Sequence, residues 1–170
     1  MYNIDYFYNM LRMYSPTAKQ ICEIRWNFVK ECKPRVVLDY GSGCGFFKAF
    51  APKGIEVDTY DLIEVPQTGI NHDDYDLITF WDVLEHCESF EFLNALLKKT
   101  DWVAVTVPIK PDNVKWDEYK HYKPLEHIHH FQHESLAALF KTFGFKCVIA
   151  GQPECPPREM IGSFLFRRAV

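Results

Sequence analysis

The sequence has no apolar run long enough to cross a membrane. A spanning helix needs about 20 consecutive, mostly apolar residues, and no stretch of the 170 residues approaches that length. The first 16 residues also lack the basic start and the apolar core of a secretory signal peptide. We therefore expect a soluble, cytoplasmic protein that has no membrane partner.

A surplus of positive charge is absent as well. The chain has 19 lysine and arginine residues against 23 aspartate and glutamate residues, which gives a formal net charge of −4. Proteins that hold nucleic acid mainly through its phosphates are usually basic. Nucleic acid is therefore not the expected partner, whereas a small molecule or another protein is compatible with this charge.

Closely spaced cysteine pairs of the CxxC type are also missing, although the chain has six cysteines. In a chain without secretory features, scattered cysteines indicate a reducing compartment, where thiols mostly fill core volume.

The hydrophobic pattern predicts one α/β domain over residues 1–170. Short apolar runs alternate with helical periodicity, which is typical of a doubly wound parallel sheet with crossover helices. No repeat or Gly/Ser linker divides the chain, so we expect an N-terminal helical or lid segment over 1–33 and a core over 34–170. The predicted strands are 36–38, 55–60, 77–81, 102–107, 145–150 and 163–168, and the predicted helices are 17–32, 90–97 and 136–143. The last two strands leave no room for a helix between them, so they should pair antiparallel near the sheet edge.

A glycine-rich turn follows the first predicted strand. Its pattern is GxGxG, formed by Gly41, Gly43 and Gly45, and Asp61 comes about 20 residues later, after the second strand. Bare backbone in such a turn can approach a ligand closely, and the later carboxylate can bind ribose hydroxyls. The dinucleotide pattern GxGxxG would need glycine at Phe46, and Asp39 would repel a pyrophosphate. These residues favour a positively charged adenosine ligand without a pyrophosphate, and S-adenosylmethionine fits both conditions.

With these motifs the chain resembles the class I S-adenosylmethionine-dependent methyltransferases. The resemblance rests on VVLDYGSGCGFF, VDTYD and YDLITFWDVLEH. The run EHIHHFQHESLAALFKTFGF is similar to a small-molecule or uncharacterised subgroup with the DVLEH motif. It implies a Rossmann-like fold with strand order 3-2-1-4-5-7-6, of which strand 7 is reversed. Only fourteen residues separate Asp61 from Asp76, so we expect the third strand to be shortened or missing, and the adenine contact is left open.

The resemblance also implies a set of cofactor-binding residues. Gly41, Ser42 and Gly43 would lie under the methionine part of S-adenosylmethionine. Asp39 would contact its amino group, and Asp61 would bind its ribose. The residues expected to flank the sulfonium are Phe80, Trp81 and Asp82.

Four histidines lie within seven residues before the last predicted helix: His127, His129, His130 and His133. Histidine is the usual base near neutral pH, so His129 or His130 is the predicted general base for methyl transfer to oxygen or nitrogen. Trp116, Tyr119 and His127 are the predicted substrate-binding residues. The alternative is that the histidines only anchor the helix near Glu134.

Two other functions stay open. If a helix begins at Asp82, then Asp82 and Glu85 share one face, and with His86 and a later His129 they could bind a divalent metal. This arrangement is similar to the metal site of RNA 2′-O-methyltransferases that act on the ends of small RNAs. The second alternative is a non-catalytic S-adenosylmethionine-binding or interaction subunit, which the short chain and the missing strand would suit.

Overall fold

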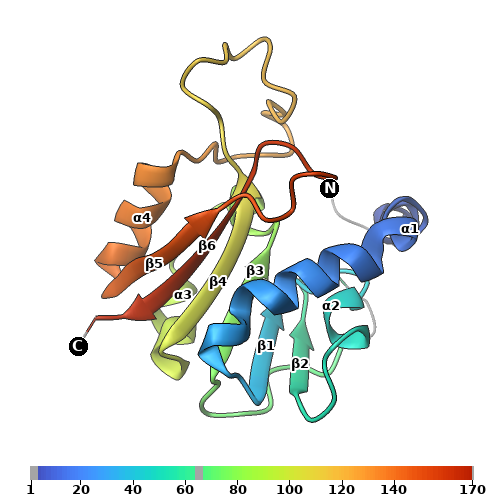
Figure 1. The fold of residues 1–170 in the computed structure, drawn as a ribbon, viewed down its shortest axis with the longest axis vertical. Coiled ribbons are helices and arrows are strands. Elements are labelled where there is room, and N and C mark those ends of the chain that lie inside the picture. The colour runs from blue at the N-terminus through green and yellow to red at the C-terminus, as the bar shows by residue number, and fades with distance from the viewer. Residues whose placement is uncertain (1–3, 64–66, 170) are drawn as a thin grey trace.

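The computed structural model describes residues 4–63 and 67–169. Its centre is a six-stranded sheet in the order β2-β1-β3-β4-β6-β5 (Figure 1). The strands are β1 (Val36–Tyr40), β2 (Glu56–Tyr60), β3 (Leu77–Trp81), β4 (Trp102–Pro108), β5 (Phe145–Gly151) and β6 (Ile161–Arg168). The first four run parallel, and β6 is antiparallel to both of its neighbours. The predicted fold class, a mostly parallel sheet with one reversed strand near its edge, is confirmed.

Helices cover both faces of this sheet, because each face is almost wholly apolar. One face packs against α1 (Ile4–Val29) and α2 (Phe46–Ala49), and the other against α3 (Leu93–Leu96) and α4 (His133–Thr142). Three short 3-10 turns complete the elements: η1 (Lys30–Cys32), η2 (Leu84–His86) and η3 (Leu97–Lys99). The result is a three-layer α/β/α arrangement in which strand side chains are buried on both sides.

Helix α1 begins earlier than the sequence indicated. The Ser15-Pro16 pair predicts a start at Thr17, whereas the helix begins at Ile4 and includes Pro16. The Pro16 ring lies on the exposed side of the helix, so the proline costs one backbone hydrogen bond without disturbing the buried stripe further along. Trp26, on that stripe, stacks on Phe47 of α2 with ring centroids 4.0 Å apart.

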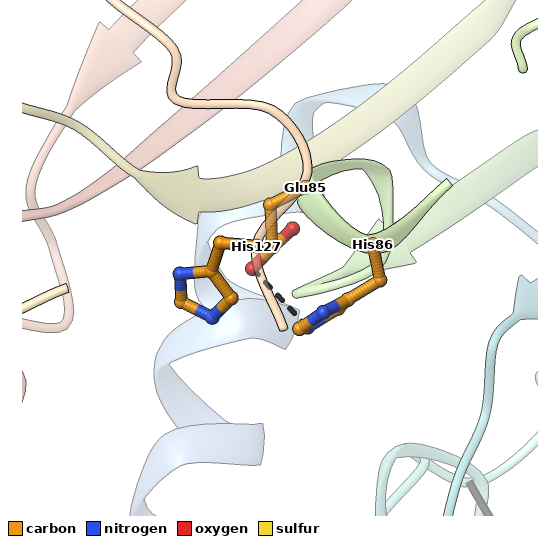
Figure 2. A group of neighbouring side chains, drawn as sticks. All are labelled: Glu85, His86 and His127. Atoms are coloured by element: carbon orange, nitrogen blue, oxygen red, sulfur yellow. Dashed lines mark ion pairs between the residues drawn. The ribbon is translucent and has the colours of Figure 1, made fainter. Parts of the chain in front are cut away.

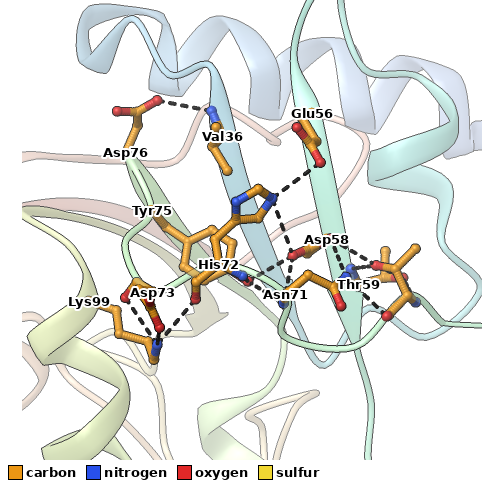
Figure 3. A network of polar contacts seen from close by, with 11 residues as sticks. Val36, Glu56, Asp58, Thr59, Asn71, His72, Asp73, Tyr75, Asp76 and Lys99 are labelled. Carbon is orange, nitrogen blue, oxygen red and sulfur yellow. Dashed lines mark hydrogen bonds and ion pairs between the residues drawn. The ribbon is translucent and has the colours of Figure 1, made fainter.

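The sheet ends at β2, where the family's third strand would add another neighbour. In the described part of the chain, the segment 67–73 covers this edge through side-chain hydrogen bonds instead (Figure 3). Thr59 N donates to Thr68 Oγ1 at 2.8 Å, and the Asn71 backbone and the Tyr75 hydroxyl donate to Asp58 at 3.0 and 2.8 Å. In the described residues a polar turn therefore lies at this edge and satisfies Asp58. The short spacing between Asp61 and Asp76 predicted only that the third strand would be shortened or missing.

The carboxyl ends of β1–β4 meet at one edge of the molecule, at the top of Figure 1. Two long connections lie over the same edge, residues 109–132 after β4 and residues 152–160 between β5 and β6. Ligands of open α/β sheets bind at this edge. Within residues 4–63 and 67–169, no helix has the length and apolar character needed to cross a bilayer.

Gly162 lies in β6, between β4 and β5 in the sheet, at a position with no room for a side chain. A Cβ atom there would lie 2.5 Å from Cγ1 of Ile109 and 2.8 Å from Cε2 of Phe164, and both of these side chains are buried. Gly151, on the neighbouring strand, has no atom within 4 Å of its Cβ position.

Replacing Gly162 with alanine should therefore lower the free energy of unfolding by about 1–3 kcal/mol, because the added methyl group overfills the core. The matched variant Gly151→Ala should be neutral or slightly stabilising. Urea denaturation of both variants measures the difference, and equal midpoints would contradict this account of β6.

Candidate functional site

The glycine turn, residues 41–45, has a backbone that only glycine adopts easily. Gly41, Gly43 and Gly45 all have positive φ angles, of 75°, 50° and 69°. At Gly41 a Cβ atom would also lie 2.4 Å from Cγ2 of Val83. The amides of Gly41 and Ser42 both donate to the carbonyl of Tyr60, at 2.7 and 3.1 Å. The turn is thus fixed to the end of β2, and its glycines allow the backbone to follow this path.

Asp61 lies directly against this turn. Its Oδ2 atom accepts a hydrogen bond from Gly43 N at 2.8 Å, and Oδ1 accepts one from Ile63 N at 2.9 Å. Gln67 in turn accepts the Asp61 amide proton at 2.7 Å. A carboxylate has about four lone-pair positions, so these two bonds leave acceptor capacity beside the turn.

Asp39, at the end of β1, is a buried carboxyl group. Its side chain accepts a hydrogen bond from Thr79 Oγ1 at 2.8 Å, and the residue is 2% exposed. Burial raises the pKa of Asp39 to about 6, although the Thr79 hydrogen bond and the charge of Arg25 both oppose this rise. A cation at this position would favour the ionised form, so the site suits a ligand with an ammonium group.

The end of β3 differs from the expected sulfonium contact. Phe80 and Trp81 are both buried, in the cores on opposite faces of the sheet. Asp82 adopts a positive φ of 60°, and both of its carboxylate oxygens accept hydrogen bonds from Arg158 at 2.9 Å. Arg25 also donates to Asp82, at 2.8 Å. Asp82 is therefore directed to two guanidinium groups.

Glu154 completes what we call the ion cluster, which consists of Arg25, Asp82, Glu154 and Arg158. Arg25 donates to Glu154 at 2.7 Å and Arg158 donates to it at 2.6 Å, and the Glu154 side chain is fully buried. The two arginines balance the two carboxylates, and they hold the pKa of Asp82 well below its usual range despite burial. The cluster joins α1, the end of β3 and the 152–160 connection.

Sequence reasoning missed three members of the ion cluster, although the signals for them are visible. Arg25 follows Ile21 by four residues and so falls within the apolar stripe of α1, where a charge needs a buried partner. Glu154 and Arg158 have the i,i+4 spacing of a local ion pair.

The predicted base residues His129 and His130 have different surroundings. The Nε2 atom of His129 lies 2.9 Å from the carbonyl of Cys87 and so donates to it, and its ring packs between Phe90 and Phe131. In His130, by contrast, Nε2 is buried and has no hydrogen-bond partner in the structure. Burial and the neighbouring His129 lower the pKa of His130, so its ring is neutral near pH 7.

Aromatic rings of the 109–132 connection surround His130. The centroids of the Trp116 and Tyr122 rings lie 5.4 and 5.3 Å from the centroid of the His130 ring. Tyr119 is buried, and its hydroxyl group has no partner in the structure. Of the predicted substrate-binding residues, Trp116 contacts both His130 and, with ring centroids 6.3 Å apart, Tyr119. The ring centroid of His127 lies 6.4 Å from that of His130, and His127 also belongs to a second group.

That second group consists of Glu85, His86 and His127 (Figure 2), each of which offers one ligand atom within 4.8 Å of the others. The predicted metal set had Asp82 and His129 beside Glu85 and His86, and the structure corrects it. No helix begins at Asp82: its backbone is left-handed and η2 begins at Leu84, so Asp82 and Glu85 do not share a helical face. Burial, followed by the charge of Asp82, raises the pKa of Glu85.

Comparison with known proteins agrees with this fold. The profile of a family described as a methyltransferase domain matches residues 17–149. No curated protein matches the chain.

Solved structures with the same fold include three that cover most of this chain. Magnesium protoporphyrin IX methyltransferase from Synechocystis, with bound SAH, has a TM-score of 0.65 and 16% identity over 89% of this chain and 83% of its own. The 1,6-didemethyltoxoflavin-N1-methyltransferase of Burkholderia thailandensis, with bound S-adenosylhomocysteine, has a TM-score of 0.67 and 17% identity over 90% and 79%. A SAM-dependent methyltransferase from Archaeoglobus fulgidus has a TM-score of 0.69 and 15% identity over 96% and 99%.

The buried carboxyl group of Asp39 should make the fold less stable at neutral pH. Its pKa of about 6 lies above the ordinary value of 3.8, so the folded chain binds more protons than the unfolded chain between these values, and stability falls as the pH rises through this window. Asp39→Asn keeps an acceptor for Thr79 and removes the charge. It should stabilise the protein by about 1–3 kcal/mol at about pH 8, and this gain should shrink as the pH falls towards 4.

Asp58→Asn is the matched control and should act in the opposite direction. Burial raises the pKa of Asp58, but hydrogen bonds from Asn71, Tyr75 and Thr68 outweigh it and lower the pKa. Urea midpoints measured across this pH range test both variants. A destabilised Asp39→Asn protein at neutral pH would contradict the assignment of a costly charge to Asp39.

Proposed function

The chain belongs to the methyltransferase domain family, and from this premise we propose that it transfers the methyl group of S-adenosylmethionine to an oxygen or nitrogen atom of a small molecule. The carrying observation is the contact between the glycine turn and Asp61, with buried Asp39 beside them. The same proposal includes the small-molecule subgroup with the DVLEH motif. Structural neighbours that act on a porphyrin and on a toxoflavin precursor support a small acceptor.

The residues of the site fit this cofactor. The backbone at Gly41, Ser42 and Gly43 would lie under the methionine part, and its path requires the positive φ angles of Gly41 and Gly43. Asp39 would hold the ammonium group, and the lone pairs of Asp61 that the turn leaves unused would accept the ribose hydroxyls.

The residues at the end of β3 would mainly support the methyl-transfer position rather than react with a ligand. Phe80 is fully buried, so only its backbone can approach a ligand. The guanidinium group of Arg25 lies 4.9 Å from the centroid of the Trp81 ring. Asp82 accepts hydrogen bonds from Arg25 and Arg158. These three residues would therefore flank the methyl-transfer position as a rigid wall whose charges are already balanced.

When bound, S-adenosylmethionine supplies a methyl group on a positively charged sulfur. The chain has to hold the acceptor in line with that group, and orientation of this kind can lower a barrier by up to about 7–11 kcal/mol. Trp116, Tyr119 and Tyr122 would position the acceptor. His130 would take the proton from the acceptor hydroxyl or amine, since its neutral Nε2 atom lacks a partner.

Removing the charge of Asp61 should weaken cofactor binding. We expect Asp61→Asn to lower the affinity for S-adenosylmethionine by about 10–100-fold, because hydrogen bonds to a charged group contribute about 1.5–3 kcal/mol. Isothermal titration calorimetry with S-adenosylmethionine and S-adenosylhomocysteine measures this.

Asp76→Asn is the matched control, because Asp76 also accepts two backbone hydrogen bonds, from Arg35 and Val36, but lies at the opposite ends of the strands. It should leave both affinities unchanged. If the unaltered protein binds neither ligand at millimolar concentration, the proposed function is wrong.

The His130→Gln variant should lose turnover but keep cofactor binding. A positioned general base contributes about 10²–10⁴-fold to rate, so kcat for an acceptor found in a panel of small alcohols, phenols and amines should fall by that factor. His133→Gln is the control, because the His133 ring packs on Phe164. Normal kcat in His130→Gln would reject His130 as the base, and cofactor binding without turnover of any acceptor would favour the non-catalytic alternative.

A further inference from the structure

Three potential metal ligands come together beyond the end of β3. Glu85 and His86 belong to η2, and His127 comes from the 109–132 connection, more than 40 positions later in the chain. Figure 2 shows the three side chains turned towards one another, and their ligand atoms lie within 4.8 Å of each other.

The backbone fixes the orientation of both imidazole rings. Nδ1 of His86 lies 2.9 Å from the carbonyl of Glu126, and Nδ1 of His127 lies 3.0 Å from the carbonyl of His121. A carbonyl oxygen only accepts, so each Nδ1 atom carries a hydrogen and donates it. In the neutral rings the lone pair is therefore on Nε2, and this is the form in which histidine binds a metal ion.

Glu85 brings an acceptor that the protein does not satisfy. The residue is 2% exposed, and its Oε2 atom is buried without a hydrogen-bond partner in the structure. Its Oε1 atom lies 3.9 Å from Nε2 of His86, which is too long for a hydrogen bond. A buried carboxyl oxygen without a partner is costly, and a ligand nitrogen of each of the two imidazoles lies within 4.8 Å of this carboxyl group.

We propose that Glu85, His86 and His127 bind a divalent first-row transition metal ion, for which zinc is the best match. Two imidazole nitrogens and one carboxylate are a ligand set that suits zinc, and three protein ligands leave one tetrahedral position for water or an acceptor atom. Magnesium and calcium prefer all-oxygen sites and fit less well. The two Nδ1–H donations to carbonyls supply the second shell that such sites need.

A metal ion at this position would tie the 109–132 connection to the end of β3. That connection carries Trp116 and His130, so the ion would hold the acceptor-binding side of the site in place. Metal binding can be measured without turnover, and this inference therefore stands apart from the proposed methyl transfer.

The test uses the full chain, freed of metal with a chelator and titrated with Co²⁺ and then with Zn²⁺. We expect one Co²⁺ per chain, with the visible absorption of a tetrahedral ion and without the near-ultraviolet bands of thiolate ligands. Zn²⁺ should displace it. Glu85→Gln and His127→Asn should each lower the affinity about 100-fold or more.

Matched variants separate this site from other causes. His133→Asn and Cys155→Ser should bind Co²⁺ as the unaltered protein does, and so should Asp61→Asn, which tests the cofactor site alone. If Glu85→Gln or His127→Asn fails to fold, the affinity for Co²⁺ is measured with His86→Asn instead. His86 has the most exposed side chain of the three ligands, at 18%. The proposal is overturned if the unaltered protein binds neither Co²⁺ nor Zn²⁺, which is the result expected if Glu85 instead shares a proton with an imidazole. It is also overturned if the folded His86→Asn variant binds Co²⁺ as the unaltered protein does.

Discussion

The ion cluster of Arg25, Asp82, Glu154 and Arg158 is the constraint on which the edge of the sheet depends. Two carboxylates and two guanidiniums are withdrawn from water together, and the loss of one partner from such a group leaves an uncompensated buried charge that costs about 3–5 kcal/mol. Because the members come from α1, the end of β3 and the 152–160 connection, these three segments cannot move independently. The cluster also engages both carboxylate oxygens of Asp82, so Asp39 and Asp61 are the carboxylates that we propose for direct contact with the cofactor.

Asp39 and the glycine turn show how stability is given up at the same edge. A carboxyl group whose pKa is about 6 in the fold disfavours the folded state at neutral pH, and three residues of the turn adopt positive φ, which side chains rarely tolerate. Neither feature helps the sheet, whose two apolar cores are complete without them. Groups that lower the stability of the fold, such as the Asp39 carboxyl group and the glycine turn, are expected where a ligand binds.

Local patterns made much of the fold and half of the site predictable. The apolar runs predicted strands close to those observed. The spacing from Asp61 to Asp76 predicted a shortened or missing third strand, and within the described residues β1 is the strand that pairs with β2. The errors arose where distant partners decide the geometry. The alternative metal site required a helix that begins at Asp82 and includes Glu85, but Arg25 and Arg158, 57 and 76 positions away, bind Asp82 in a left-handed turn. Similarly, His127 replaces His129 beside Glu85, because the carbonyl of Cys87 engages the His129 ring.

The two halves of the site therefore have different origins. The proposed cofactor half consists of two short motifs, the glycine turn after β1 and Asp61 after β2, so the sequence is enough to find it. In our proposal the acceptor half is formed by the 109–132 connection, which lacks regular secondary structure. Two hydrogen bonds join this connection to η2: His129 N donates to the carbonyl of Glu85, and Nδ1 of His86 donates to the carbonyl of Glu126. Since such connections vary more than the elements that they join, our proposal assigns the choice of acceptor to Trp116, Tyr119 and their neighbours. Substitutions at these residues should change which acceptor is methylated and leave the affinity for S-adenosylmethionine unchanged.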